Sequence, residues 1–129
     1  MANKYTEKLI SIVVPIYNEA EIIEESVKRL MELINSINYP CELVIVNDGS
    51  SDGSLMILEN LAKNNPILKI VSFSRNFGHQ IAYTAGMDVA CGDAVIVIDG
   101  DLQDPPELIN NFILEWENGY EVVYGVRSD

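Results

Sequence analysis

The chain alternates short apolar runs with longer segments in which apolar residues recur every three or four positions. Short runs rich in valine and isoleucine are typical of buried strands, whereas the longer spacing is typical of amphipathic helices. The apolar runs predict strands at 9–14, 42–46, 69–73, 94–98 and 121–124. The amphipathic segments predict helices at 21–35, from residue 51 or 52 to about 63, at 80–90 and at 106–118.

Strands that alternate with helices indicate an α/β fold with a mostly parallel sheet. Strands that are apolar along their length are buried on both sides, so helices should cover both faces of the sheet. The 129 residues are enough for one domain with a hydrophobic core, and no repeat or linker divides them. We therefore expect a single domain over residues 1–129.

Composition narrows the classes of ligand. The 20 Asp and Glu residues against 8 Lys and Arg give a formal net charge of −12. A nucleic acid or an anionic membrane surface needs a basic footprint, so neither is expected as a partner. An anionic small molecule would also be repelled unless a metal ion bridged it to the protein.

The two cysteines and the absence of targeting signals bear on location. Cys41 and Cys91 lie in apolar sequence, without the spacing of a metal site or a redox motif. We expect both thiols to be buried and reduced, which suits a cytoplasmic protein. The sequence contains no signal peptide and no apolar run long enough to span a membrane.

Polar motifs follow each of the predicted strands. In a parallel α/β sheet, this carboxyl edge is where ligands bind, near the point at which the strand order reverses. Turn chemistry accounts for Gly49, Gly78 and Asp52, but not for the gathering of polar residues at one edge. We therefore expect a binding site built from the motifs at 15–19, 47–52, 74–80, 99–101 and 125–127.

The most informative motif is the pair Asp99 and Asp101, which follows the apolar run 95–98 with Gly100 between the two acids. Alternate residues of an extended segment point the same way, so both carboxylates can enter one site. Such carboxylates repel each other unless a cation lies between them, and Mg²⁺ or Mn²⁺ takes oxygen ligands together with substrate phosphates. The alternative is a solvated turn with helix-capping acids, because Asp104 precedes two prolines.

Two common nucleotide-binding motifs are absent from the sequence. No G-x-G-x-x-G follows the first predicted strand, where Pro15, Ile16 and Tyr17 stand instead, and no Walker A motif occurs. A dinucleotide dehydrogenase and a P-loop nucleotidase are therefore not expected. What remains is a metal-bound nucleotide that carries a diphosphate, with Asp48 able to hydrogen-bond an edge of the base.

Taken together and in this order, four motifs resemble those of family 2 glycosyltransferases, which have the GT-A fold. They are Val14-Pro-Ile-Tyr-Asn-Glu19, Val46-Asn-Asp-Gly-Ser-Ser-Asp52, Ser74-Arg-Asn-Phe-Gly78 and Asp99-Gly-Asp-Leu-Gln-Asp-Pro-Pro106. The last two are most similar to those of enzymes that transfer sugars to polyprenyl phosphate, such as dolichol-phosphate mannosyltransferases and undecaprenyl-phosphate glucosyltransferases. The resemblance spans about residues 10–127 and implies the nucleotide-binding half of a GT-A fold.

The resemblance implies that three of the motifs form the nucleotide pocket. Pro15, Tyr17 and Glu19 would line the space for the base and ribose of the donor. Asp48 would contact the base, in agreement with the hydrogen bond expected from its position. Arg75 would either pair with the acidic residues around it or meet a phosphate, and the sequence does not decide between these roles.

By the same resemblance, the acidic motif would hold the metal ion. Asp99 and Asp101, with Gly100 between them, would be its D-x-D motif, with Asp101 the more direct ligand and Gln103 a further one. Mg²⁺ or Mn²⁺ there would stabilise the charge on the departing nucleoside diphosphate. Arg127 would neutralise donor phosphate as well.

The implied reaction transfers a sugar from a UDP- or GDP-linked donor, with inversion at the sugar carbon, to an acceptor such as polyprenyl phosphate. Family members continue well beyond the length of this chain. We therefore expect an N-terminal part without a complete acceptor site, with the catalytic base beyond Asp129. The full-length protein would work in the cytoplasm, at the cytoplasmic face of a membrane. We also expect self-association, because the fifth strand would expose an edge and apolar surface.

Two other classes remain open from the residues. A phosphatase of the haloacid dehalogenase type also carries Asp-x-Asp after a strand, although near the start of the chain, whereas here the motif follows the fourth predicted strand. A non-catalytic nucleotide-binding module is the second class. Metal-dependent binding of a nucleotide sugar, followed by transfer of the sugar, distinguishes the transferase from both.

Overall fold

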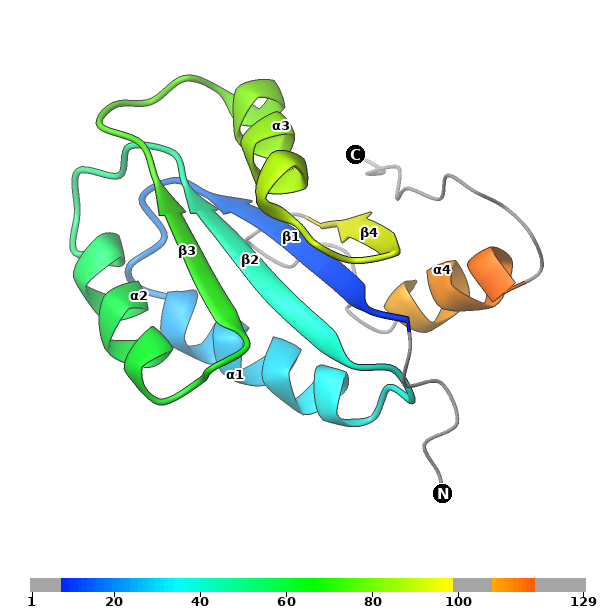
Figure 1. Ribbon diagram of the computed structural model, residues 1–129. Coiled ribbons are helices and arrows are strands. Elements are labelled where there is room, and N and C mark those ends of the chain that lie inside the picture. The colour runs from blue at the N-terminus through cyan, green and yellow to red at the C-terminus, as the bar shows by residue number, and fades with distance from the viewer. Residues whose placement is uncertain (1–7, 99–107, 118–129) are drawn as a thin grey trace.

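The computed structural model describes residues 8–98 and 108–117, which form a parallel sheet with helices packed on it (Figure 1). The elements are β1 (Ile10–Ile16), α1 (Ile23–Asn35), β2 (Cys41–Asn47), α2 (Ser54–Lys63), β3 (Leu68–Ser72), α3 (His79–Val89), β4 (Ala94–Val97) and α4 (Leu108–Glu117). The expected alternation of strands and helices is confirmed, with ends that differ by a few residues. The strand expected at 121–124 lies outside the described residues.

The strand order is β3-β2-β1-β4, and every described pair is parallel. β1 and β2 are central and wholly buried, in agreement with their mostly apolar sequences. The chain moves from β1 to β2 to β3 in one direction and then crosses back to place β4 on the other side of β1. The order therefore reverses between β1 and β4, and such a switch point is where α/β sheets bind ligands.

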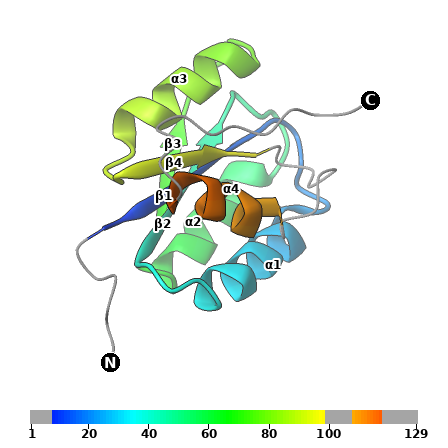
Figure 2. The same ribbon diagram turned by 90° about the vertical axis from the view of Figure 1, so that its right-hand side faces the viewer.

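Helices cover both faces of the sheet, as the sequence predicted (Figure 2). On one face, Leu30 of α1, Leu58 of α2 and Ile113 of α4 belong to the larger hydrophobic cluster. On the other face, α3 is the one helix that the structure describes, and its Ala82 packs in a smaller cluster with Val13. Right-handed crossovers account for the place of α3 on the face opposite α1 and α2, because the chain reverses its direction across the sheet between β3 and β4.

The described pairing of β1 with β4 ends before Pro15. The N–H of Ile98 donates to the carbonyl of Val13 at 3.0 Å. In a parallel ladder the next bond on this side of β1 would use the N–H of residue 15, which proline lacks. On the β2 side pairing continues, and the carbonyl of Ile16 accepts the N–H of Asp48 at 2.9 Å. Pro15 therefore cannot donate the next bond towards β4, although β1 itself continues to Ile16.

The two cysteines differ in exposure. Cys41 is buried, and burial raises the pKa of its thiol to about 11. The expectation that Cys91 is also buried was wrong, because it lies in the turn between α3 and β4 and is exposed. Among the described helices, none has both the length and the apolar character needed to cross a membrane.

Candidate functional site

The loops after β1, β2 and β3 meet at the carboxyl edge of the sheet (Figure 1). They and the end of β1 carry the residues expected to form the nucleotide pocket: Pro15, Tyr17, Glu19, Asp48 and Arg75. Two of these, Pro15 and Asp48, are buried, Glu19 is half-buried, and Tyr17 and Arg75 are exposed. The structure therefore brings the expected pocket residues to one edge, although ligand contacts stay predictions.

Asn18 joins the first loop to the second. Its backbone φ is 51°, a left-handed conformation that Asn adopts more readily than most residues. Its side-chain oxygen accepts the N–H groups of Ser51 at 2.8 Å and Asp52 at 3.3 Å. In return, its own N–H donates to Oγ of Ser50 at 2.9 Å. Hydrogen bonds in both directions fix the spacing of the two loops.

Asp52 and Ser54 brace the same two loops from the start of α2. One carboxylate oxygen of Asp52 accepts the N–H of Ala20 at 3.1 Å. The other accepts the hydroxyl of Ser54 at 2.6 Å and its N–H at 2.9 Å. These hydrogen bonds, led by that from the Ser54 hydroxyl, hold the pKa of Asp52 below its usual value. Oγ of Ser54 in turn accepts the N–H of Glu19 at 3.1 Å, so the first loop is held at consecutive residues.

Asp48 ties the second loop to the third. Asp48 is 1% exposed. Its carboxylate accepts hydrogen bonds from the N–H groups of Phe77 at 2.7 Å and Gly78 at 3.0 Å, and from the side-chain amide of Asn76 at 3.1 Å. The neighbouring Gly49 has a φ of +72°, and a Cβ there would lie 2.1 Å from the backbone of the third loop. Only glycine allows so close an approach in this conformation.

Arg75 is the one Lys or Arg in the described loops after β1, β2 and β3. Its guanidinium lies over the ring of Phe77, 4.5 Å from the ring centroid, and Phe77 stands edge-on to Phe73 at 5.4 Å. Within the described parts of the chain Arg75 makes no ion pair. The pairing with acidic residues that the sequence left open is therefore not observed there.

The expected metal site falls on residues that the structure does not describe. These are Asp99, Gly100, Asp101 and Gln103, and the expected phosphate contact Arg127 also lies outside the described residues. Ile98, directly before the acidic pair in sequence, is held against β1 at the switch point. Within residues 8–98 and 108–117, no three His, Cys, Asp or Glu side chains come together as a metal site.

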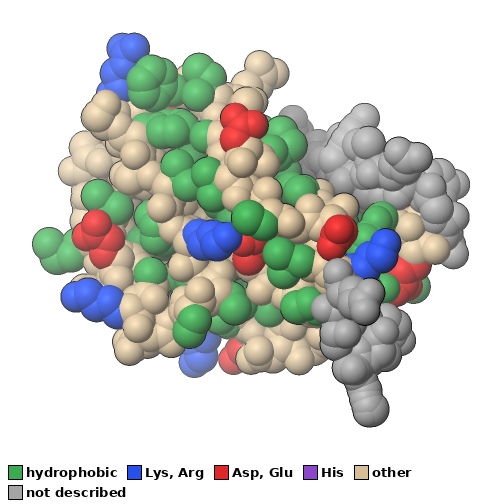
Figure 3. Space-filling model, viewed as in Figure 1, with side chains coloured by type: hydrophobic (Ala, Val, Ile, Leu, Met, Phe, Trp, Pro, Cys, Tyr) green, Lys and Arg blue, Asp and Glu red, His purple; other side chains and the backbone are tan. Residues whose placement is uncertain are grey.

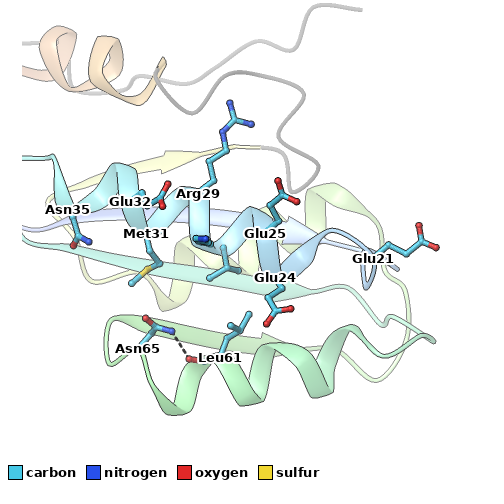
Figure 4. Close-up of a pocket in the computed structure, with 11 residues that line it drawn as sticks. Glu21, Glu24, Glu25, Arg29, Met31, Glu32, Asn35, Leu61 and Asn65 are labelled. Atoms are coloured by element: carbon cyan, nitrogen blue, oxygen red, sulfur yellow. Dashed lines mark hydrogen bonds between the residues drawn. The ribbon is translucent and has the colours of Figure 1, made fainter.

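A groove between α1 and α2 is a separate feature (Figure 4). The charged side chains that line it are Glu21, Glu24, Glu25, Glu32, Lys28 and Arg29. The acids outnumber the bases, so the groove does not suit an anionic nucleotide. None of the residues expected in the nucleotide pocket lines it.

Sequence reasoning gave no role to the residues that hold the loops together. Asn18 and Asn76 were part of the motifs, but their bonding partners lie 28 to 34 residues away in the chain. The available signal was an Asn in each of the loops that follow β1 and β3. A side-chain amide there can satisfy the backbone of a neighbouring loop.

The chain is similar to known glycosyltransferases in sequence. The model of the family described as Glycosyl transferase family 2 matches residues 11–129. The uncharacterized glycosyltransferase YkcC of Bacillus subtilis is 57% identical over 118 residues, which are 92% of this chain and 36% of YkcC. The bactoprenol glucosyl transferase of Shigella phage SfV is 46% identical over 120 residues, which are 93% of this chain and 39% of that protein. The chain thus spans little more than a third of the length of these relatives.

A solved structure shows the same fold. The mannosyltransferase PcManGT from Pyrobaculum calidifontis, in complex with GDP-Man and Mn²⁺, superimposes with a TM-score of 0.65 at 27% identity. The match covers 80% of this chain and 34% of that protein. The expected α/β fold of the GT-A type is confirmed.

Proposed function

Because this chain belongs to glycosyltransferase family 2, we propose that it binds a nucleoside-diphosphate sugar at the carboxyl edge of its sheet through a divalent metal ion. One observation carries the proposal. The loops after β1, β2 and β3 are joined by hydrogen bonds beside the switch point, where the acidic motif follows β4. The family membership favours a transferase over the phosphatase and the non-catalytic module that the residues alone left open.

The pocket and metal roles follow the motifs. Pro15, Tyr17 and Glu19 would line the space for the base and ribose, with Asp48 beside it. The carboxylates of Asp99 and Asp101, separated by Gly100, and the amide oxygen of Gln103 are hard oxygen ligands that suit Mg²⁺ or Mn²⁺. When bound, the ion would neutralise charge on the departing diphosphate. Arg75 and Arg127 would add positive charge to a chain whose net charge is −12.

The whole protein would transfer the sugar with inversion to a polyprenyl phosphate. A bactoprenol glucosyl transferase at 46% identity supports this acceptor class, and GDP-Man and Mn²⁺ in a structural neighbour support the donor and metal classes. A lipid acceptor would place the work at the cytoplasmic face of a membrane. The donor base, UDP or GDP, stays open.

Calorimetric titration of UDP and GDP tests this proposal. We expect one of them to bind in the presence of Mn²⁺ or Mg²⁺ and binding to disappear with chelator. Asp101→Ala should abolish the metal-dependent binding. Asp88→Ala, which removes an exposed acid of α3, should leave it unchanged. Binding of neither nucleotide to the wild-type chain with either metal would contradict the proposal.

A further inference from the structure

Three consecutive backbone N–H groups of the first loop donate to side-chain oxygens of the second. The pairs are Asn18 with Ser50 at 2.9 Å, Glu19 with Ser54 at 3.1 Å and Ala20 with Asp52 at 3.1 Å. All three donors lie before α1, and all three acceptors lie between β2 and the first turn of α2. The second loop therefore determines the path that the first loop takes after β1.

Asp52 and Ser54 act as one unit in this contact. One carboxylate oxygen of Asp52 accepts the hydroxyl of Ser54 at 2.6 Å, and the other accepts the N–H of Ala20. A serine hydroxyl has one proton to donate and two lone pairs. Because that proton goes to Asp52, the oxygen of Ser54 faces the N–H of Glu19 as an acceptor. Ser54 is wholly buried, so water does not compete for this arrangement.

The starts of two helices favour a negative charge at this position. Neither α1 nor α2 has a side-chain hydrogen bond from its N-cap residue. Asp52 precedes α2 in the chain, and its bond to Ala20 brings the carboxylate to the segment before α1. An anion near a helix N-terminus is stabilised by the helix dipole. The ionised carboxylate is therefore suited to joining the two loops.

The backbone of Tyr17 is fixed on both sides by this arrangement. Before it, the carbonyl of Ile16 accepts the N–H of Asp48 at 2.9 Å. After it, Asn18 has a left-handed backbone and is bonded to Ser50. The side chain of Tyr17 is nevertheless 43% exposed at the carboxyl edge of the sheet. An exposed aromatic ring on a fixed backbone is suited to stacking on a planar base.

We propose that Asp52 is a positioning residue for the donor: it braces the first loop, directly and through Ser54, and so holds the ring of Tyr17 where the base stacks. This inference rests on the proposed function, because it assumes that the base of a nucleoside diphosphate lies beside Tyr17. It gives Asp52 a role beyond the turn chemistry that its sequence position indicates.

The first test measures the loop without any ligand. Asp52→Asn keeps the size of the side chain but turns one carboxylate oxygen into an NH₂ group, so whichever way the amide lies, this group faces N–H or O–H donors. Amide hydrogen exchange of Glu19 or Ala20 should become at least about fivefold faster. Exchange at Val44, in the buried strand β2, should not change. Unchanged exchange at both loop amides would overturn the proposal.

Asp93→Asn is the matched control for this variant. The carboxylate of Asp93 also accepts a backbone N–H, that of Leu9 at 2.8 Å, but at the amino edge of the sheet. Exchange at Leu9 should become faster in Asp93→Asn, whereas exchange at Glu19 and Ala20 should stay as in the wild type. Faster exchange at Glu19 and Ala20 in both variants would mean that the loop responds to any loss of charge, which would overturn the specific role of Asp52.

The second test asks whether Asp52 acts through Tyr17. In calorimetric titrations with Mn²⁺, Tyr17→Ala should weaken binding of UDP or GDP by about tenfold, and Asp52→Asn by about fivefold. The double variant should lose no more than Tyr17→Ala alone, because without the ring there is nothing left to position. Asp93→Asn should bind as the wild type does. Losses that add in the double variant would overturn the proposal, since a general loosening of the loops does not depend on the ring.

Ser54→Ala keeps the proposal testable if Asp52→Asn does not fold. It removes the hydroxyl that bonds both Asp52 and Glu19 and replaces a buried side chain by one of similar size. It should weaken nucleotide binding in the wild-type background but not in the Tyr17→Ala background. If the wild-type chain binds neither nucleotide, the proposed function fails and this inference fails with it. Wild-type binding that stays equally tight in Asp52→Asn and Ser54→Ala overturns the positioning role alone.

Discussion

Asn18 combines a left-handed backbone with hydrogen bonds to the neighbouring loop. Two substitutions distinguish the contributions of these features. Gly tolerates the left-handed backbone but lacks the side-chain amide, whereas Ala lacks the amide and also disfavours this backbone conformation. We predict that Asn18→Gly lowers the free energy of unfolding by about 1–2 kcal/mol, and Asn18→Ala by about 1 kcal/mol more. Urea unfolding followed by circular dichroism measures both losses. Equal losses would show that the backbone conformation has no cost at this position.

At the scale of single residues, the sequence predicted which side chains gather but not what holds them. Tyr17, Asp48 and Arg75 each follow a strand. The carboxyl ends of parallel strands lie at one edge of the sheet, so the residues that follow them come together there. The bonds from Asp48 to the third loop join residues 28 to 30 apart in the chain. Contacts of this kind depend on how two loops pack and leave no local pattern. The sequence could therefore assign Asp48 only a ligand role.

At the scale of elements, apolar runs located each described strand, and the main differences have local causes. The expected end of the first strand at residue 14 was too early, because β1 continues through Pro15 to Ile16. Proline is tolerated at this position because its missing N–H would point towards β4, beyond the last described pair of β1 and β4. The sequence also placed Glu42 in a strand without predicting its burial. Its partners come from β1, β3 and the turn before β4, so they are set by how these segments lie side by side rather than by sequence spacing.

Glu42 lies at the amino edge of the sheet, opposite the candidate site, and is 5% exposed. It accepts the hydroxyl of Ser11 at 2.5 Å and the N–H of Cys91 at 2.6 Å, and it pairs with Lys69 at 2.5 Å. Burial raises the pKa of Glu42, but the hydrogen bonds from Lys69, Ser11 and Cys91 outweigh it and hold the pKa below its ordinary value. The network fastens β1, β2 and β3 to the turn before β4.

This lowered pKa predicts a pH dependence of stability. The folded-state pKa of Glu42 lies below its ordinary value of 4.5, so its contribution is present above that value and is lost as the pH falls towards the folded-state pKa. We predict that Glu42→Gln lowers the free energy of unfolding by about 3 kcal/mol at neutral pH, and by less below pH 4.5. Urea unfolding at both pH values measures the difference.

Glu59→Gln is the matched control, because Glu59 is exposed on α2. It should change the free energy of unfolding by no more than about 0.5 kcal/mol. A difference between Glu42→Gln and wild type that stays constant over this pH range would contradict the role assigned to the network.

α3 approaches the sheet closely at Gly86. A Cβ there would lie 2.3 Å from Cγ1 of Val13 and 3.1 Å from Cγ2 of Val46. We predict that Gly86→Ala lowers the free energy of unfolding by about 1–3 kcal/mol, although Ala has the higher helix propensity. Gly53→Ala, with nothing within 4 Å, should change it by less than about 1 kcal/mol. Thermal unfolding compares the two variants, and a stabilised Gly86→Ala would contradict this packing.

At the scale of the whole molecule, charge and apolar surface are unevenly distributed. The net charge is −12, yet on the face shown in Figure 3 hydrophobic side chains are spread over the whole surface and acidic side chains occur singly. Ile81 and Met87 are each 48% exposed, and Val89 is 39% exposed. α3 is the one helix described on its face of the sheet, so its exposed apolar side chains form a surface available for association.

We predict that the 129-residue chain self-associates with rising concentration. β3 and β4 are the edges of the described sheet, and α3 adds apolar surface. Ile81→Glu should weaken association, whereas Met56→Glu on α2, where the side chain is 69% exposed, should not. Sedimentation velocity at several concentrations measures both effects. A strict monomer at the highest concentration would contradict the prediction.

The proposed function requires that a divalent metal ion and a nucleotide bind together at the carboxyl edge of the sheet. Mn²⁺ is paramagnetic and broadens the amide resonances of nearby residues, so titrating ¹⁵N-labelled protein with Mn²⁺ and UDP or GDP locates the ion. We predict selective broadening at Tyr17, Gly49 and Ile98, and little at Cys91 on the opposite edge or at Asn65 beside the groove. Broadening centred on the groove, or no selective broadening with either nucleotide, would contradict the claim.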